Sequence, residues 1–237
     1  MTQPSNTQRH QIIIVGGGAA GISVAASLLR RDQSLDIGII EPSDRHFYQA
    51  AFTLVGAGCY AAEATVREEV GLIPSGVNWI RAAATRFDPD GNIVELDSGL
   101  SVEYEYLVVC PGLALNWEGI EGLPETIGKN NVSSNYLLEY ARYTRSSLES
   151  LEGGRLLFTQ PPMPIKCAGA PQKIMYLAAN ELERNNKLGN FDIEFHTATP
   201  ALFGVADFVP PLMKYIERYG VSLNLQSNLV AIDGNQI

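Results

Sequence analysis

The stretch QIIIVGGGAAGISVAASLL, residues 11–29, decides the fold class of this chain. Its first residues are apolar and mostly β-branched, three consecutive glycines follow, and the remainder has the small and apolar spacing of a helix packed on a sheet. It is the longest run without a charged residue. Its change of composition nevertheless predicts a buried strand, a turn and a helix rather than a membrane span or a signal peptide.

Three glycines at the turn form a nucleotide-binding fingerprint, Gly16-x-Gly18-x-x-Gly21. Gly16 permits the tight turn, Gly18 lets the backbone approach a pyrophosphate, and Gly21 lets helix and strand pack closely. The next apolar run, residues 35–40, ends at Glu41, where a carboxylate accepts ribose hydroxyls and repels a 2′-phosphate. We therefore expect a dinucleotide without a 2′-phosphate, either FAD or NAD.

The chain after Glu41 predicts an antiparallel meander. Turn residues separate three strand-like runs, at residues 77–87, 93–96 and 101–109. The last run leads into Pro111-Gly112. A meander inserted here, followed by a strand that ends in this pair, resembles the two-dinucleotide flavoprotein reductases, in which FAD occupies the first unit. The resemblance favours FAD as the cofactor.

A second cycle of alternating strands and helices begins at Gly153-Gly154. Its strands are expected at residues 155–159, 191–196 and 221–225, and its helices at 135–151, 170–185 and 206–219. The predicted fold class is α/β, with two Rossmann-like, three-layer dinucleotide-binding units of the flavoprotein reductase type. Residues 1–125 are predicted as the FAD-binding unit. Residues 126–237 are predicted as a second, incomplete unit, with the C-terminal part of the fold missing.

The second unit lacks the glycine fingerprint of a nicotinamide site. At the corresponding place the chain has the run PPMPIKC, residues 161–167, and prolines have no N–H with which to cradle a pyrophosphate. Cys167 precedes a predicted helix, beside Lys166 and near Lys173, so the helix dipole and two ammonium groups are expected to favour its thiolate form. A thiolate in the place of a nicotinamide could face the flavin. The alternative is a small packed residue.

The stretch PIKCAGAPQKIMYL, residues 164–177, closely resembles the central signature of the sulfide:quinone oxidoreductase family. Further matches are EPSDRHFYQ at 41–49, TLVGAG at 53–58, GLPE at 122–125 and LFGV at 202–205. The resemblance implies an FAD enzyme that holds sulfide sulfur on a pair of cysteines and passes electrons through the flavin to a membrane quinone. It also implies a small thiol or sulfur acceptor and peripheral membrane contact.

The resemblance assigns roles to individual residues. It implies that Cys167 carries the persulfide and attacks the flavin after sulfide has attacked a disulfide or trisulfide linked to it. It implies that Lys173 and Glu125 tune charge or protons near this catalytic site. The implied cofactor contacts are Gly16, Gly18, Ala19, Ala20, Gly21, Glu41, Gln49 and Ala84.

The chain also departs from the family pattern. A member needs a second cysteine, a Gly-Asp motif and C-terminal amphipathic helices, and neither Cys59 nor Cys110, both expected to be packed thiols, matches the missing partner. We therefore expect an N-terminal half to two-thirds of such an enzyme, with its own activity open. Two alternatives stay open: a flavoprotein like type II NADH:quinone reductase, disfavoured by the absent second fingerprint, and a non-catalytic FAD-binding remnant.

Composition and charge limit the partners. The 237 residues include 26 acidic and 17 basic side chains, and the formal charge of −9 argues against a nucleic-acid partner. The acids Glu63, Glu68 and Glu69 are predicted to form a solvated helix face. No metal site is expected, because His10 and His196 lack ligand spacing. A homo-oligomer stays open, and the expected location is the bacterial cytoplasm or the cytoplasmic face of the membrane.

Overall fold

The computed structural model describes residues 7–233, which form two compact units. The first unit extends to Tyr48 and resumes at Val66–Leu113, while the second combines Gln49–Thr65 with the chain from Ala114 onward. This division by packing differs from the predicted boundary after residue 125 at two segments. Helix α2, Phe52–Gly56, packs on the second unit's helices, and Leu123 packs in a cluster with Ile127 and Ile232.

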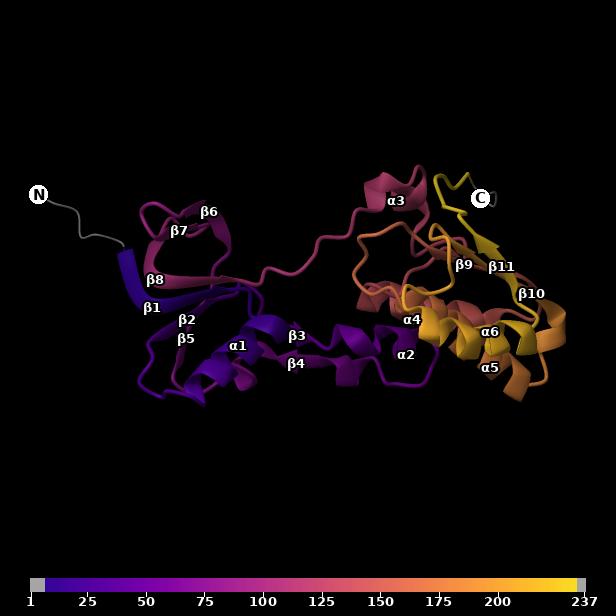
Figure 1. Ribbon diagram of the computed structural model, residues 1–237, viewed down its shortest axis with the longest axis horizontal. Helices are drawn as coiled ribbons and strands as arrows, with labels where there is room; N and C mark the ends of the chain where they lie inside the picture. The colour runs from indigo at the N-terminus through magenta and orange to yellow at the C-terminus, as the bar shows by residue number, and fades with distance from the viewer. Residues whose placement is uncertain (1–6, 234–237) are drawn as a thin grey trace, which may run out of the picture. The chain divides into compact units, whose positions relative to one another are not determined.

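A six-stranded sheet forms the centre of the first unit, in the order β5-β2-β1-β8-β7-β6 (Figure 1). Its strands are β1 Thr7–Val15, β2 Ile37–Ile40, β5 Val77–Ile80, β6 Ala84–Asp88, β7 Ile93–Leu96 and β8 Ser101–Val109. Strands β5, β2, β1 and β8 run parallel, and β8, β7 and β6 run antiparallel. The predicted parallel unit and its meander are therefore confirmed.

One predicted strand is wrong, because residues 77–87 do not form a single strand. Its two halves, β5 and β6, lie at opposite edges of the sheet. Between them the backbone N–H of Ala82 donates to the carbonyl of Ile80 at 2.9 Å, and both side chains are buried. The chain turns here without a glycine or a proline, so the sequence pattern gives no signal of the break.

Helix α1, Ala19–Leu29, covers one face of the first sheet. Ala25 packs against Ile12 and Ile14 of β1, while the alternate residues Ile13 and Val15 belong to a separate buried cluster on the other face. A central strand buried on both faces needs a continuous apolar run. This requirement explains the apolar run at residues 12–15, ahead of the glycine turn.

The second unit contains a three-stranded parallel sheet in the order β11-β10-β9 (Figure 1). Its strands are β9 Gly154–Gln160, β10 Phe191–Thr197 and β11 Ser222–Leu225, and its longer helices are α4 Leu138–Ser150, α5 Ala170–Arg184 and α6 Val209–Arg218. Phe195 of β10, Met175 of α5 and Ile216 of α6 meet in its core. The predicted alternation of strands and helices is confirmed here, with small differences at the ends.

Shorter elements complete the two units. Helix α3 spans Leu123–Thr126, and β3, Arg45–Phe47, pairs antiparallel with β4, Val66–Glu68. The single-turn 3-10 helices are η1 Gln49–Ala51, η2 Glu63–Thr65, η3 Glu69–Gly71, η4 Trp117–Gly119, η5 Leu188–Asn190 and η6 Ala206–Phe208. The predicted solvated helix over residues 63–69 is wrong, since this segment is a turn, a short strand and another turn.

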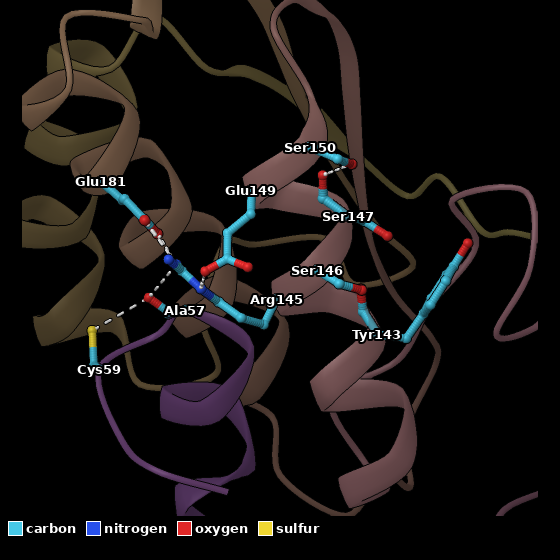
Figure 2. A network of polar contacts seen from close by, with 9 residues as sticks. All are labelled: Ala57, Cys59, Tyr143, Arg145, Ser146, Ser147, Glu149, Ser150 and Glu181. Atoms are coloured by element: carbon cyan, nitrogen blue, oxygen red, sulfur yellow. Dashed lines mark hydrogen bonds and ion pairs between the residues drawn. The ribbon is translucent and has the colours of Figure 1, made fainter.

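Arg145 on α4 joins three parts of the second unit (Figure 2). Its Nη1 donates to both carboxylate oxygens of Glu181 on α5 at 2.7 Å, and its Nε donates to Glu149 at 2.7 Å. Nη1 also lies 3.5 Å from the carbonyl of Ala57, just after α2. A Cβ on Gly58 would collide with this guanidinium. The hydrogen bond that Arg145 donates to Glu181 is the largest cause of its raised pKa, and the bond to Glu149 adds to it.

Replacing Arg145 with methionine is expected to destabilise the second unit. The change leaves Glu181 without its hydrogen-bond donor and removes the contact between α4 and the Ala57 carbonyl after α2. Hydrogen bonds to charged groups contribute about 1.5–3 kcal/mol each in favourable cases, so we expect a loss of roughly 2 kcal/mol, or about 4–8 °C in the melting midpoint. Thermal melts followed by circular dichroism measure this. The matched control is Arg142→Met on the same helix, whose exposed pair with Glu63 should contribute under about 1 kcal/mol. Equal losses in both variants would contradict the special role of Arg145.

Candidate functional site

The glycine turn between β1 and α1 has the geometry that its spacing predicts. Gly16 has φ +103°, a conformation that L side chains rarely adopt, and a Cβ there would overlap the carbonyl of Cys110. A Cβ on Gly21 would overlap the carbonyl of Gly16. Gly18 is exposed, and a Cβ on it would meet no atom within 4 Å among the described residues. Gly16 and Gly21 therefore allow close backbone packing, whereas Gly18 leaves open space beside the turn.

The first turn of α1 faces this space. Ala19 and Ala20 are exposed, and within residues 7–233 no side chain caps the helix at Gly18. The N–H groups of a first helical turn lack partners within the helix, and the helix dipole adds partial positive charge at that end. This end of the helix can therefore bind an anion such as a pyrophosphate.

Glu41 stands at the end of β2 with its carboxylate already oriented. Its Oε2 accepts the N–H of Gly17 at 2.8 Å, and its Oε1 accepts the N–H of Ser43 at 2.8 Å. The indole N–H of Trp79 donates to the Glu41 carbonyl at 2.9 Å. Each carboxylate oxygen retains a lone pair for a ribose hydroxyl. The glycine turn, the helix start and this acid thus fit the adenosine diphosphate half of FAD, and they lie together within the first unit.

Glu69 lies beside this turn and was missed by the sequence prediction, which placed it on a solvated face. It is 2 % exposed, its Oε2 lies 3.3 Å from His46 Nδ1, and its Oε1 has no hydrogen-bond partner in the described part of the chain. A Cβ on Gly17 would lie 2.7 Å from both this Oε1 and the Cγ of Glu41. Burial raises the pKa of Glu69, nearby Glu41 raises it further, and His46 opposes the shift. An acidic residue type alone gives no signal of such burial.

Replacing Glu69 with glutamine is expected to remove a pH dependence of stability. The raised pKa means that Glu69 stabilises the folded chain below its ordinary pKa of 4.5, and that this contribution is lost as the pH rises through the folded-state value. Glutamine stays neutral, so the melting midpoint of Glu69→Gln should rise relative to the unmodified protein as the pH increases. Each unit of pKa shift corresponds to roughly 3–5 °C. Melts from about pH 4 to pH 8 measure it, with the exposed neighbour Glu68→Gln as control, and a constant difference would contradict the assignment.

The cysteine segment of the second unit lies between β9 and α5. Cys167 is exposed, three residues before the first residue of α5, and its carbonyl accepts the N–H of Ala170 at 3.1 Å. Cys59 and Cys110 are also free thiols among the described residues. Cys59 is exposed, so its predicted packing is wrong, because the chain after α2 turns it outward. Cys110 is half-buried at the end of β8.

Four other predicted site residues lie on other elements of the two units. Ala84 begins β6 at the far edge of the first sheet, and Gln49 is exposed in η1 of the second unit. Glu125 is exposed in α3, and Lys173 is exposed in α5, where it lines an apolar groove of about 410 Å³ between α5 and α6. In the described part of the chain no hydrogen bond or ion pair joins Cys167 to Lys173 or Glu125. Their catalytic roles, like the cofactor contacts, stay predictions.

Metal-binding clusters and membrane-spanning helices are both absent from the described residues. Within residues 7–233, no group of three or more His, Cys, Asp or Glu side chains could hold a metal ion. None of the helices in that same range combines the length and the apolar character needed to cross a bilayer.

Several known proteins that are similar to this chain are named sulfide:quinone oxidoreductase. The sulfide:quinone oxidoreductase, mitochondrial, of Mus musculus is 40% identical over 223 residues, which cover 94% of this chain and 50% of the relative. The protein of the same name from Dictyostelium discoideum is 39% identical over 227 residues, covering 95% and 50%. The X-ray structure of the Aquifex aeolicus sulfide:quinone oxidoreductase has the same fold, with a TM-score of 0.82 at 24% identity over 95% of this chain and 52% of that one.

These findings confirm the resemblance to sulfide:quinone oxidoreductases and the predicted α/β flavoprotein fold. The chain spans about half the length of the curated relatives it matches. Both relatives from mouse and Dictyostelium are named as mitochondrial, so the expected bacterial location has no support.

The family match decides the cofactor. Residues 10–149 match the pyridine nucleotide-disulphide oxidoreductases. Proteins of this kind are FAD-binding flavoproteins, so the prediction of FAD is confirmed at the level of the family. The glycine turn, the free helix start and the oriented Glu41 all lie within the matched residues. The chain belongs to the pyridine nucleotide-disulphide oxidoreductase family.

Proposed function

We propose that this chain takes part in the FAD-dependent oxidation of sulfide, with Cys167 holding the sulfur as a persulfide and the electrons passing to a quinone. The proposal rests on one observation above others. Cys167 is exposed in a proline-rich loop, three residues before a 15-residue helix of a Rossmann-like unit that lacks a glycine fingerprint. The identity of 40% to a protein named sulfide:quinone oxidoreductase supports it.

Each part of the chain has a defined task in this proposal. The first unit holds the nucleotide through its glycine turn and Glu41. Cys167 is linked through a disulfide or trisulfide to a second thiol, supplied by the small thiol partner. HS⁻ attacks the sulfur of that thiol and forms a new S–S bond there. The bond toward Cys167 breaks, so Cys167 leaves with the electron pair, as a thiolate from a disulfide or as a persulfide anion from a trisulfide. When bound in the first unit, FAD would supply the acceptor for the two electrons that sulfide loses and the donor of electrons to a quinone. Lys173 and Glu125 are proposed to tune charge or protons near the sulfur.

The partners follow from the same chemistry. Sulfide supplies the electrons, a small thiol or sulfur acceptor removes the sulfane sulfur, and a membrane quinone takes the electrons. Peripheral contact with a membrane belongs to the proposal because a quinone is dissolved in the bilayer.

The test uses the purified chain loaded with FAD. FAD is titrated first, and its binding is followed by quenching of flavin fluorescence. Sulfide is then added without oxygen, and the flavin absorbance near 450 nm is recorded. The proposal expects bleaching by sulfide and none by NADH, because the loop at residues 161–167 lacks a pyrophosphate cradle.

Other outcomes point to other functions. Rapid bleaching by NADH would favour a flavoprotein like type II NADH:quinone reductase. FAD binding without bleaching by sulfide would favour a non-catalytic FAD-binding chain. Absence of FAD binding would overturn the nucleotide site itself.

A further inference from the structure

The loop that carries Cys167 has few attachments of its own. It runs from Pro161 to Gly169, between the end of β9 and the start of α5. Prolines at 161, 162 and 164 have no N–H to donate. Among the described residues, the one main-chain hydrogen bond that holds residues 161–168 is that of Ala170 N–H to the Cys167 carbonyl, at 3.1 Å. The loop must therefore be fixed by side chains.

Tyr136 supplies these side-chain contacts together with Lys166. The Tyr136 hydroxyl donates to the carbonyl of Cys167 at 3.0 Å, and the Lys166 ammonium donates to the carbonyl of Tyr136 at 3.3 Å. The two bonds run in opposite directions between the same two segments, 30 residues apart in sequence. The Tyr136 N–H in turn donates to Ser134 Oγ at 3.2 Å. This reciprocal pair holds both the residue before the cysteine and the cysteine itself.

We infer that Tyr136 is a positioning residue for Cys167, which fixes the peptide of the cysteine at the start of α5 through its hydroxyl. This inference rests on the proposed function of Cys167. Because Tyr136 and Ala170 share one acceptor, losing the phenol leaves the carbonyl with one donor and lets the loop rotate. A displaced nucleophile reacts more slowly even when it is chemically intact.

Burial shifts the pKa of both side chains of this pair in the direction that favours the neutral form. Burial, and then the neighbouring Cys167, raises the pKa of Tyr136 to about 12, so its hydroxyl keeps the proton that it donates. Burial lowers the pKa of Lys166, and its Nζ lies 3.3 Å from the Tyr136 carbonyl. Neither group has a carboxylate partner in the described part of the chain.

The test is Tyr136→Phe, which removes one oxygen atom and keeps the ring. We expect the limiting rate of flavin reduction by sulfide to fall about tenfold, while the sulfide concentration at half-saturation and the melting midpoint stay unchanged. A purely structural role would lower the midpoint and leave the limiting rate of the folded fraction alone. Hydrogen–deuterium exchange adds a readout that needs no activity: amides of residues 166–170 should exchange faster, and those of β10 should not.

The matched control is Tyr143→Phe on α4, where the Tyr143 hydroxyl accepts the N–H of Asn131 at 3.0 Å. This variant should change neither the limiting rate of flavin reduction nor the exchange of residues 166–170. Lys166→Met removes the other half of the pair and should speed the same amides, which keeps the test available if Tyr136→Phe does not fold. Unchanged exchange and an unchanged limiting rate in Tyr136→Phe would overturn the inference while the function of Cys167 stands. If sulfide does not reduce the flavin of the unmodified chain, the proposed function fails, and the exchange experiment still decides whether Tyr136 fixes the loop.

Discussion

Replacing Cys167 with serine is expected to abolish the reduction of bound flavin by sulfide, with a loss of at least roughly a thousandfold. The reaction needs a sulfur atom that can be a thiolate, hold a second sulfur in an S–S bond and act as a leaving group. A serine hydroxyl has none of these properties at neutral pH. Because Cys167 is exposed, the change leaves no cavity, and the melting midpoint should shift by less than about 2 °C. Anaerobic stopped-flow absorbance near 450 nm measures the rate.

The two other free thiols provide matched controls for this variant. Cys59 is exposed in the second unit, and Cys110 is half-buried in the first. Serine at either position should leave flavin reduction within about twofold of the unmodified chain. A Cys167→Ser protein that is still reduced at the normal rate would contradict the proposed role. Equal losses in all three variants would indicate a general effect on folding.

Replacing Gly18 with valine is expected to abolish nucleotide binding while leaving the fold intact. A Cβ at this position would meet no atom within 4 Å among the described residues, so we expect little loss in packing. The same side chain would occupy the open space in front of the N–H groups of Ala19 and Ala20, which a pyrophosphate must approach closely. We expect the affinity for FAD to fall at least roughly a hundredfold. Fluorescence titration with FAD, together with a thermal melt of the unloaded chain, measures both quantities.

Two comparison variants separate binding from packing. Gly21→Val places atoms against the carbonyl of Gly16 and near Ile14, so it should lower both the melting midpoint and the affinity. A Cβ on Gly204 in the second unit would also meet no atom within 4 Å among the described residues, so Gly204→Val should change neither the melting midpoint nor the affinity for FAD. A Gly18→Val protein that binds FAD normally would contradict the assignment of this turn to the nucleotide.

Much of the first unit can be predicted from local sequence. Residues 11–41 contain the strand, the glycine turn, the helix and the acid. These elements follow from the hydrophobic periodicity and from glycines that are required for steric reasons, and both can be recognised in the sequence. Of the predicted site, the structure brings together Gly16, Gly18, Ala19, Ala20, Gly21 and Glu41. It does not connect Cys167 with Lys173 or Glu125 by any hydrogen bond or ion pair within residues 7–233.

Two features of the first unit depend on contacts between residues that are distant in the chain. The strand predicted at 77–87 divides between opposite edges of the sheet, because pairing with β2 ends at Ile80 and pairing with β7 begins at Ala84. Glu69 is buried because the packing of η3 beside Gly17 and His46 covers it, whereas its residue type predicts exposure.

The sequence by itself determined the class of the fold and the glycine turn after β1, and it marked Cys167 as the candidate nucleophile, since each depends on residue type and short spacing. Only the tertiary structure decided which side chains hold that cysteine. Tyr136 lies 31 residues before it, and no local pattern marks a hydroxyl that will meet a distant carbonyl. Such a contact exists because the folding of α4, β9 and α5 around one core brings the two segments together, and that information lies in packing rather than in sequence period.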